Sequence, residues 1–152
     1  MSINPFDLHT VLTAKHAQHV VLIHFPIALF TAAVAFDYLS FWTKSKSLAS
    51  AAYFNLLGAA LVSIPTVVTG VLAWRWALEG QRLKGILLEH LVLGWTSAIL
   101  IWIVSWMHWR ARQRAETTAL PVLRFAVEFV GMALVTVTGH LGGFLSGVNL
   151  PS

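Results

Sequence analysis

The chain has 152 residues, of which 57% are hydrophobic and only 11% are charged. Soluble domains are about a quarter charged, so this composition indicates a membrane protein and excludes a disordered chain. The net charge of +4 comes from ten Lys and Arg against six Asp and Glu. An excess this small indicates membrane topology, and it excludes a nucleic-acid-binding protein. The absence of cysteine excludes disulfides, thiolate nucleophiles, iron–sulfur clusters and covalently attached c-type haem.

Four stretches of the chain contain no charged side chain, and each is long enough to cross a bilayer as a helix of about 20 residues. We predict helices near residues 18–42, 50–75, 86–108 and 121–146. The connections are short, so consecutive helices are expected to run antiparallel. The predicted fold is therefore all-α: residues 1–152 form a single transmembrane domain, a four-helix antiparallel bundle.

The basic residues predict how this bundle is oriented. One end is expected to carry six of them, Lys44, Lys46, Arg110, Arg112, Arg114 and Arg124. The other end is expected to carry both termini and four basic residues, Lys15, Arg75, Arg82 and Lys84. Because cytoplasmic loops are enriched in Lys and Arg, we expect the first end in the cytoplasm and both termini in the periplasm. The predicted location is the bacterial inner membrane, in contact with the lipid bilayer.

Three histidines are expected at a similar depth below the outer surface, on three different helices: His24, His90 and His140. His19 lies about one turn before His24. Five residues of helix turn the chain by about 500°, so these two rings point about 140° apart and cannot bind one ion together. They serve two centres, or only one of them is a ligand. His108, on the inner side, is expected to be an interfacial or hydrogen-bonded residue.

Small residues surround His140 in the run Gly139-His140-Leu141-Gly142-Gly143. Such residues let a flat macrocycle or a second helix approach the backbone closely. Pro26, two residues after His24, frees a backbone carbonyl nearby, and Pro65 is expected to kink the second helix.

Two sequence boxes carry a family resemblance: HFPIAL at residues 24–29, preceded by His19, and GHLGG at residues 139–143. With the Thr69-Gly70 pair and His90, they resemble the bacterial membrane-protein family known as domain of unknown function 2231. The resemblance covers most of the chain. It implies a four-helix membrane domain that carries histidines, and it does not by itself supply a function.

Histidines without cysteine, in an apolar and aromatic bundle, favour a b-type haem held by two imidazoles from different helices. The candidate ligands are His24, His90, His140 and His19, sufficient for one or two haems. Gly139, Gly142 and Gly143 are expected to form the slot. Arg75 and Arg82, with Lys15 and Lys84, are the cations expected to bind the propionates. The protein is then an electron-transfer subunit that exchanges electrons with a periplasmic redox partner and with quinone or another cytochrome. It is not expected to be an enzyme by itself.

Two alternatives stay open. Three imidazoles at one depth also suit a copper or zinc ion, although the three methionines form no cluster typical of copper carriers. A proton or ion path is the other alternative. Asp37 and Glu128 lie in the inner half, where Arg124 is placed to pair with either carboxylate. No hydrolase or phosphate-binding motif is present, so an acid–base or nucleophilic enzyme has the least support.

Overall fold

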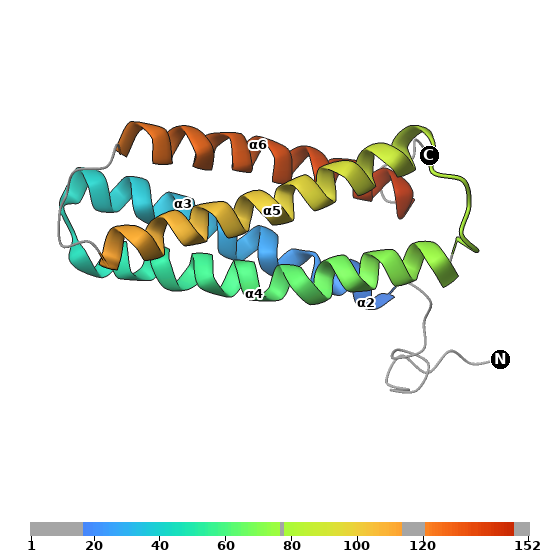
Figure 1. The fold of residues 1–152 in the computed structure, drawn as a ribbon, viewed down its shortest axis with the longest axis horizontal. Coiled ribbons are helices and arrows are strands. Elements are labelled where there is room, and N and C mark those ends of the chain that lie inside the picture. Colours follow the sequence, from blue (N-terminus) through green and yellow to red (C-terminus); the bar gives the residue numbers. More distant parts are fainter. Residues whose placement is uncertain (1–16, 77, 114–120, 148–152) are drawn as a thin grey trace.

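We describe a computed structural model that covers residues 17–76, 78–113 and 121–147 (Figure 1). In this part of the chain every regular secondary-structure element is a helix. The helices are α2 (Ala17–Leu22), α3 (His24–Thr43), α4 (Lys46–Trp76), α5 (Gly85–Gln113) and α6 (Pro121–Leu145). Because α2 and α3 are nearly continuous, there are four helical spans long and apolar enough to cross a membrane. The predicted all-α, four-helix membrane bundle is confirmed.

The spans lie side by side, with α6 and α4 at the two edges of the view and α3 and α5 between them (Figure 1). Consecutive spans are antiparallel, which defines two ends of the bundle. We call one the His19 end, where α2 and α5 begin and α4 and α6 end. The other is the Lys44 end, where α3 and α5 end and α4 and α6 begin.

The first span is interrupted at Ile23, where we expected one continuous helix. Pro26 has no N–H to donate to the carbonyl of Leu22, so one helical hydrogen bond is missing there. The hydroxyl oxygen of Thr66, on α4, lies 3.4 Å from that carbonyl oxygen. It also lies 2.9 Å from the carbonyl oxygen of Val62, on its own helix. A hydroxyl on a neighbouring span is therefore placed to bond the carbonyl that the proline leaves free.

Two spans are longer than the charge gaps predicted. The α5 helix continues to Gln113, five residues past the expected end at 108, and α4 begins at Lys46 instead of near residue 50. Charged residues mark where a span leaves the hydrocarbon, but Lys, Arg and Gln are good helix formers and let the helix continue into the aqueous phase.

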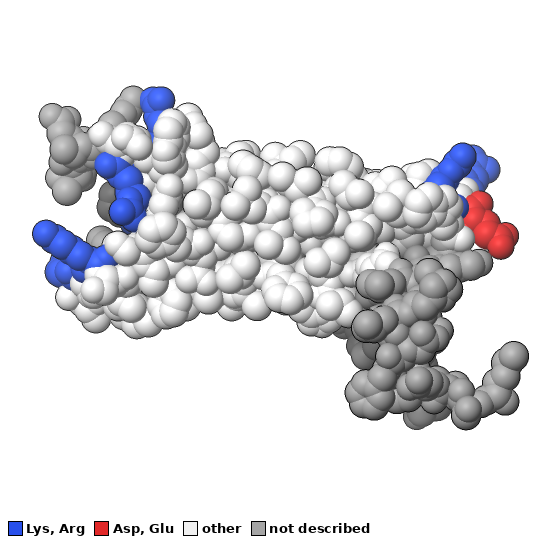
Figure 2. Space-filling view, turned by 90° about the horizontal axis from the view of Figure 1, so that it is seen from below, with Lys and Arg blue, Asp and Glu red and all other residues white. Residues whose placement is uncertain are grey.

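The buried core lies between the two ends and is built from small and branched apolar residues of all four spans. Its fully or nearly fully buried members are Phe30, Ala33, Leu56, Ala59, Ala60, Ile101, Val104 and Val135. Most other large apolar side chains are exposed, as expected for residues that face lipid. The space-filling view shows the same organisation, with a broad uncharged middle and charged side chains confined to the ends (Figure 2).

Candidate functional site

Polar and titratable side chains gather in the bundle at its two ends. At the His19 end, His19 of α2 and His90 of α5 lie close together. At the Lys44 end, Asp37 of α3, His108 of α5 and Glu128 of α6 form a compact group. The apolar core separates the two groups along every span.

His19 is held by α4. Its Nδ1 atom lies 3.1 Å from the carbonyl oxygen of Thr66 and 3.4 Å from the hydroxyl oxygen of Thr69. A carbonyl can only accept a hydrogen bond, so Nδ1 carries the proton and donates it, which leaves the lone pair on Nε2. The ring lies against Gly70, where an added Cβ atom would be 2.9 Å from Cε1 of the histidine. Gly70 therefore provides the space that this ring occupies.

His90 is held in the same way by α6. Its Nδ1 atom lies 3.0 Å from the carbonyl oxygen of Thr138, so this ring also donates from Nδ1 and keeps its lone pair on Nε2. An added Cβ atom at Gly142 would lie 3.1 Å from Cε1 of the His90 ring. The small residue at 142 thus makes room for the imidazole. An added Cβ atom at Gly139 would be 3.7 Å from a methyl group of Ile27, an ordinary contact.

The centroids of the two rings lie 6.4 Å apart, and the rings are nearly perpendicular, with their planes at 78°. Both are half-buried. All four spans contribute to the arrangement, since α2 and α5 supply the rings while α4 and α6 supply the carbonyls. Among the described residues, neither Nε2 atom has a hydrogen-bond partner. This is the geometry of two neutral imidazoles oriented by carbonyls and free to bind through Nε2.

The other predicted ligands lie elsewhere. His24 is exposed, and its Nδ1 atom bonds the carbonyl oxygen of Val20 on the same span, 2.7 Å away. His140 is exposed, and its ring packs edge-on against Phe144 of its own helix at 5.0 Å between centroids. The structure thus brings together two of the four predicted histidines, His19 and His90.

The remaining predicted site residues within the described part of the chain lie at the His19 end of the bundle. Gly143 is half-buried on α6, while Arg75 and Arg82 are exposed at the His19 end. Lys15 and Arg114 lie outside the described residues, as do both termini.

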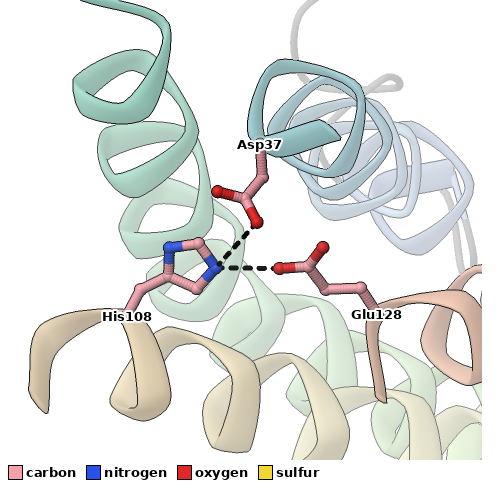
Figure 3. A group of neighbouring side chains, drawn as sticks. All are labelled: Asp37, His108 and Glu128. Atoms are coloured by element: carbon pink, nitrogen blue, oxygen red, sulfur yellow. Dashed lines mark hydrogen bonds and ion pairs between the residues drawn. The ribbon is translucent and has the colours of Figure 1, made fainter. Parts of the chain in front are cut away.

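The group at the Lys44 end is more deeply buried than the histidine pair. Glu128 is 0% exposed, Asp37 3% and His108 5%. The Nε2 atom of His108 lies 2.8 Å from Oε1 of Glu128 and 3.8 Å from Oδ2 of Asp37, so one ring nitrogen points at two carboxyl groups from different helices (Figure 3).

Arg124 adds a permanent positive charge to this group. Its Nε atom lies 2.9 Å from Oδ2 of Asp37 and 4.0 Å from Oε1 of Glu128, which confirms the pairing of Arg124 with these acids. The contact with Asp37 is an ion pair whose N–H is not directed at the oxygen. Oε2 of Glu128 is buried and has no hydrogen-bond partner in the described part of the chain.

Sequence reasoning recognised the acids of this group but left His108 apart from them. His108 is hydrogen-bonded, as expected, but it is buried instead of interfacial. The available signal was depth: Asp37, His108 and Glu128 lie on three spans at the same end of an antiparallel bundle. Depth alone does not say which faces of the helices meet.

The comparisons with known proteins identify a family and no function. A family model described as "Predicted membrane protein (DUF2231)" matches residues 15–148. No curated protein matches the chain. No solved structure matches it either.

Proposed function

The chain belongs to the DUF2231 family of predicted membrane proteins, and from that premise we propose that it is a membrane-embedded electron-transfer subunit. In this proposal His19 and His90 would hold one b-type haem near the His19 end. The subunit would exchange electrons with a periplasmic redox partner and with quinone or another cytochrome.

The observation that carries the proposal is the separation of the two rings. A metal ion bound by two imidazoles would hold their ring centres about 5–6 Å apart, depending on the angle at the metal, because each metal–nitrogen bond is about 2.0 Å and each centre lies about 1 Å behind its nitrogen. The rings of His19 and His90 are 6.4 Å apart, and they come from different helices. Their Nδ1 atoms already donate to carbonyls, which is the usual outer-shell partner of a metal-bound histidine.

The number of ligands favours haem over a bare copper or zinc ion. A zinc site needs three or four protein ligands. The described residues contain one group of three His, Asp or Glu side chains close enough to hold an ion, and that group lies at the Lys44 end. A haem macrocycle supplies four nitrogens itself and needs only two axial ligands from the protein. Two imidazoles from different spans meet that requirement.

The residues around the pair fit a non-covalently held group. The chain has no cysteine to attach a haem covalently. Gly70 and Gly142 allow the Cε1 edge of each ring to lie directly against a neighbouring helix, which fixes the position of both imidazoles. A bound haem would supply one-electron chemistry. The chain itself orients two imidazoles, and Arg75 and Arg82 at the same end are available to bind acidic substituents.

One centre per chain is proposed, because His24 and His140 are exposed on the outside of the bundle. Among the described residues, the Lys44 end carries Lys44, Lys46, Arg110, Arg112 and Arg124. We therefore place this end on the cytoplasmic side of a bacterial inner membrane. The His19 end, with its histidine pair, then faces the periplasm and the redox partner.

The test is an absorption spectrum of the detergent-purified protein, oxidised and dithionite-reduced, with pyridine haemochromogen quantitation. We expect the reduced α-band of b-type haem and one haem per chain. His19→Ala and His90→Ala should each abolish the band, whereas His24→Ala and His140→Ala should keep it. A colourless protein from haem-replete cells would overturn the proposal. Retention of the haem in both His19→Ala and His90→Ala would overturn the assignment of the ligands.

A further inference from the structure

We propose that Asp37, His108, Glu128 and Arg124 form a buried proton-binding site that exchanges protons with the solution at the Lys44 end. This site is distinct from the histidine pair and does not depend on the haem proposal. It is called the acid cluster below.

The charges of the acid cluster do not balance without an additional proton. Arg124 contributes one permanent positive charge, and Asp37 and Glu128 contribute two negative charges when both are ionised. A net charge is costly at a site removed from water, so a buried group of this kind requires compensation. One bound proton brings the sum to zero. A divalent metal ion would instead leave an excess positive charge.

The contacts indicate where that proton resides. Arg124 is closest to Asp37, with 2.9 Å between Nε and Oδ2, and these two opposite charges form a pair. Glu128 is left with His108, at 2.8 Å between Oε1 and Nε2. The additional proton is therefore shared by His108 and Glu128.

The position of Arg124 also disfavours a metal ion. An ion bound by this group would contact Oδ2 of Asp37, Oε1 of Glu128 and Nε2 of His108. The guanidinium nitrogen lies 2.9 Å from the first of these atoms and 4.0 Å from the second. Two cations would then be held within a few ångströms of each other in an apolar environment, where their repulsion is weakly screened.

A pocket of about 280 Å³ connects the acid cluster to the Lys44 end. Liquid water occupies about 30 Å³ per molecule, so the pocket has room for several waters. Asp37, His108 and Arg124 line it, but Glu128 does not. His108 therefore stands between the pocket and Glu128, and its second ring nitrogen is on the side away from both carboxyl groups (Figure 3).

The sequence of pocket, His108 and Glu128 defines a route for a proton. A hydronium ion in the pocket gives a proton to Nδ1 of neutral His108 and becomes water, and the ring becomes an imidazolium. The imidazolium then passes its Nε2 proton to Oε1 of Glu128, which leaves a neutral ring and a neutral carboxylic acid. The reverse sequence releases the proton to the pocket.

Every packed span contributes a group that faces or borders the site. The hydroxyl groups of Ser40, Ser50 and Tyr53 line the pocket together with the cations Lys46 and Arg112. Arg112 lies over the ring of Tyr53, 4.5 Å from its centroid, and Tyr38 donates a hydrogen bond to the carbonyl of Phe125. On the other side of the acid cluster lie apolar core residues such as Phe30, Val104 and Val135. The described residues thus form a site that opens to one end, and they do not form a channel.

The experiment is pH-difference infrared spectroscopy of the full-length protein, as purified, in lipid nanodiscs, in H₂O and in D₂O. Between mildly acidic and alkaline pH, exposed carboxylates stay ionised while exposed histidines also titrate, so the signal sought is the one protonation per chain that depends on Glu128. It appears as the carbonyl stretch of a carboxylic acid or as the ring mode of an imidazolium, and it shifts in D₂O. Glu128→Gln should abolish the signal, and the control Glu89→Gln, exposed on α5, should keep it.

Two further measurements complete the test. If Glu128→Gln does not fold, His108→Asn replaces it and should shift the frequency of the same signal, because the proton then resides on Glu128 alone. Zinc and manganese titrations followed by elemental analysis should give no stoichiometric ion that depends on Glu128. A signal that both substitutions leave unchanged, the absence of any signal, or one metal ion per chain lost in Glu128→Gln would each overturn the proposal.

Discussion

Gly70 and His19 approach each other so closely that a methyl group at position 70 would lie 2.9 Å from Cε1 of the imidazole. Real Cβ atoms essentially never come so near, so the ring position depends on the missing side chain. A glycine in a helix interior costs up to about 1 kcal/mol relative to alanine. Here it permits an imidazole of α2 to lie against α4.

Gly70→Ala is therefore expected to displace His19 and to lower haem occupancy. Outer-shell changes of this kind reduce affinity by about tenfold or more. Haem content per chain, measured by pyridine haemochromogen, is the readout. Gly94→Ala is the matched control, because its added Cβ atom would be 3.9 Å from Thr138, an ordinary contact. Equal haem content in both variants would contradict the role of His19.

Gly142→Ala is expected to act on the second ring, but less strongly. Its added Cβ atom would lie 3.1 Å from Cε1 of His90, which a small shift of the ring can relieve. We expect a shifted reduced α-band or redox potential with the haem retained. Gly139→Ala, with 3.7 Å to Ile27, should leave both unchanged. A larger effect at 139 than at 142 would show that the cofactor is not held through His90.

His108→Ala is expected to destabilise the bundle without affecting the haem spectrum. It removes the hydrogen-bond partner of the buried Glu128 carboxyl group, which typically costs about 1–3 kcal/mol. Unfolding by denaturant in detergent measures the loss. His24→Ala, which removes an exposed imidazole, should have little effect on stability. The double variant His108→Ala/Glu128→Gln should be less destabilised than the sum of its single variants.

Gly131→Ala tests the packing of the core between the two sites. Its added Cβ atom would lie 2.7 Å from a methyl carbon of Leu100 and 2.8 Å from the ring of Phe30. Overpacking of this kind costs about 1–3 kcal/mol, so the unfolding midpoint should fall. Gly94→Ala again serves as the control. A midpoint at or above that of the wild type would show that the α5–α6 contact is looser than described.

Membrane orientation can be measured directly because the chain has no cysteine. Single substitutions Lys46→Cys and Arg82→Cys place one thiol at the Lys44 end and one at the His19 end. In intact bacterial cells a membrane-impermeant maleimide should label Arg82→Cys only, and disruption of the membrane should expose Lys46→Cys. The opposite pattern would place the histidine pair on the cytoplasmic side.

The four spans and their antiparallel order were predictable from sequence, because the cost of placing charges in hydrocarbon leaves gaps that mark each crossing. The depth of a residue follows equally simply, since a helix advances by about 1.5 Å per residue. Histidines near the His19 end and acids near the Lys44 end were therefore predicted at the correct ends. The interruption at Ile23 was not predicted, because Pro26 is tolerated inside a span where neighbouring groups are placed to bond the freed carbonyl.

Which residues meet was decided only by the tertiary structure. The sequence alone determined depth, but the direction in which each side chain points depends on how the helices rotate and pack. Here Gly70 and Gly142 admit His19 and His90 to the space between spans, while His24 and His140 face outward. The same rotation brings Nε2 of His108 to Asp37 and Glu128. Nearly uniform hydrophobicity around α3, α4 and α5 hides this rotation from the sequence, because lipid and core are both apolar.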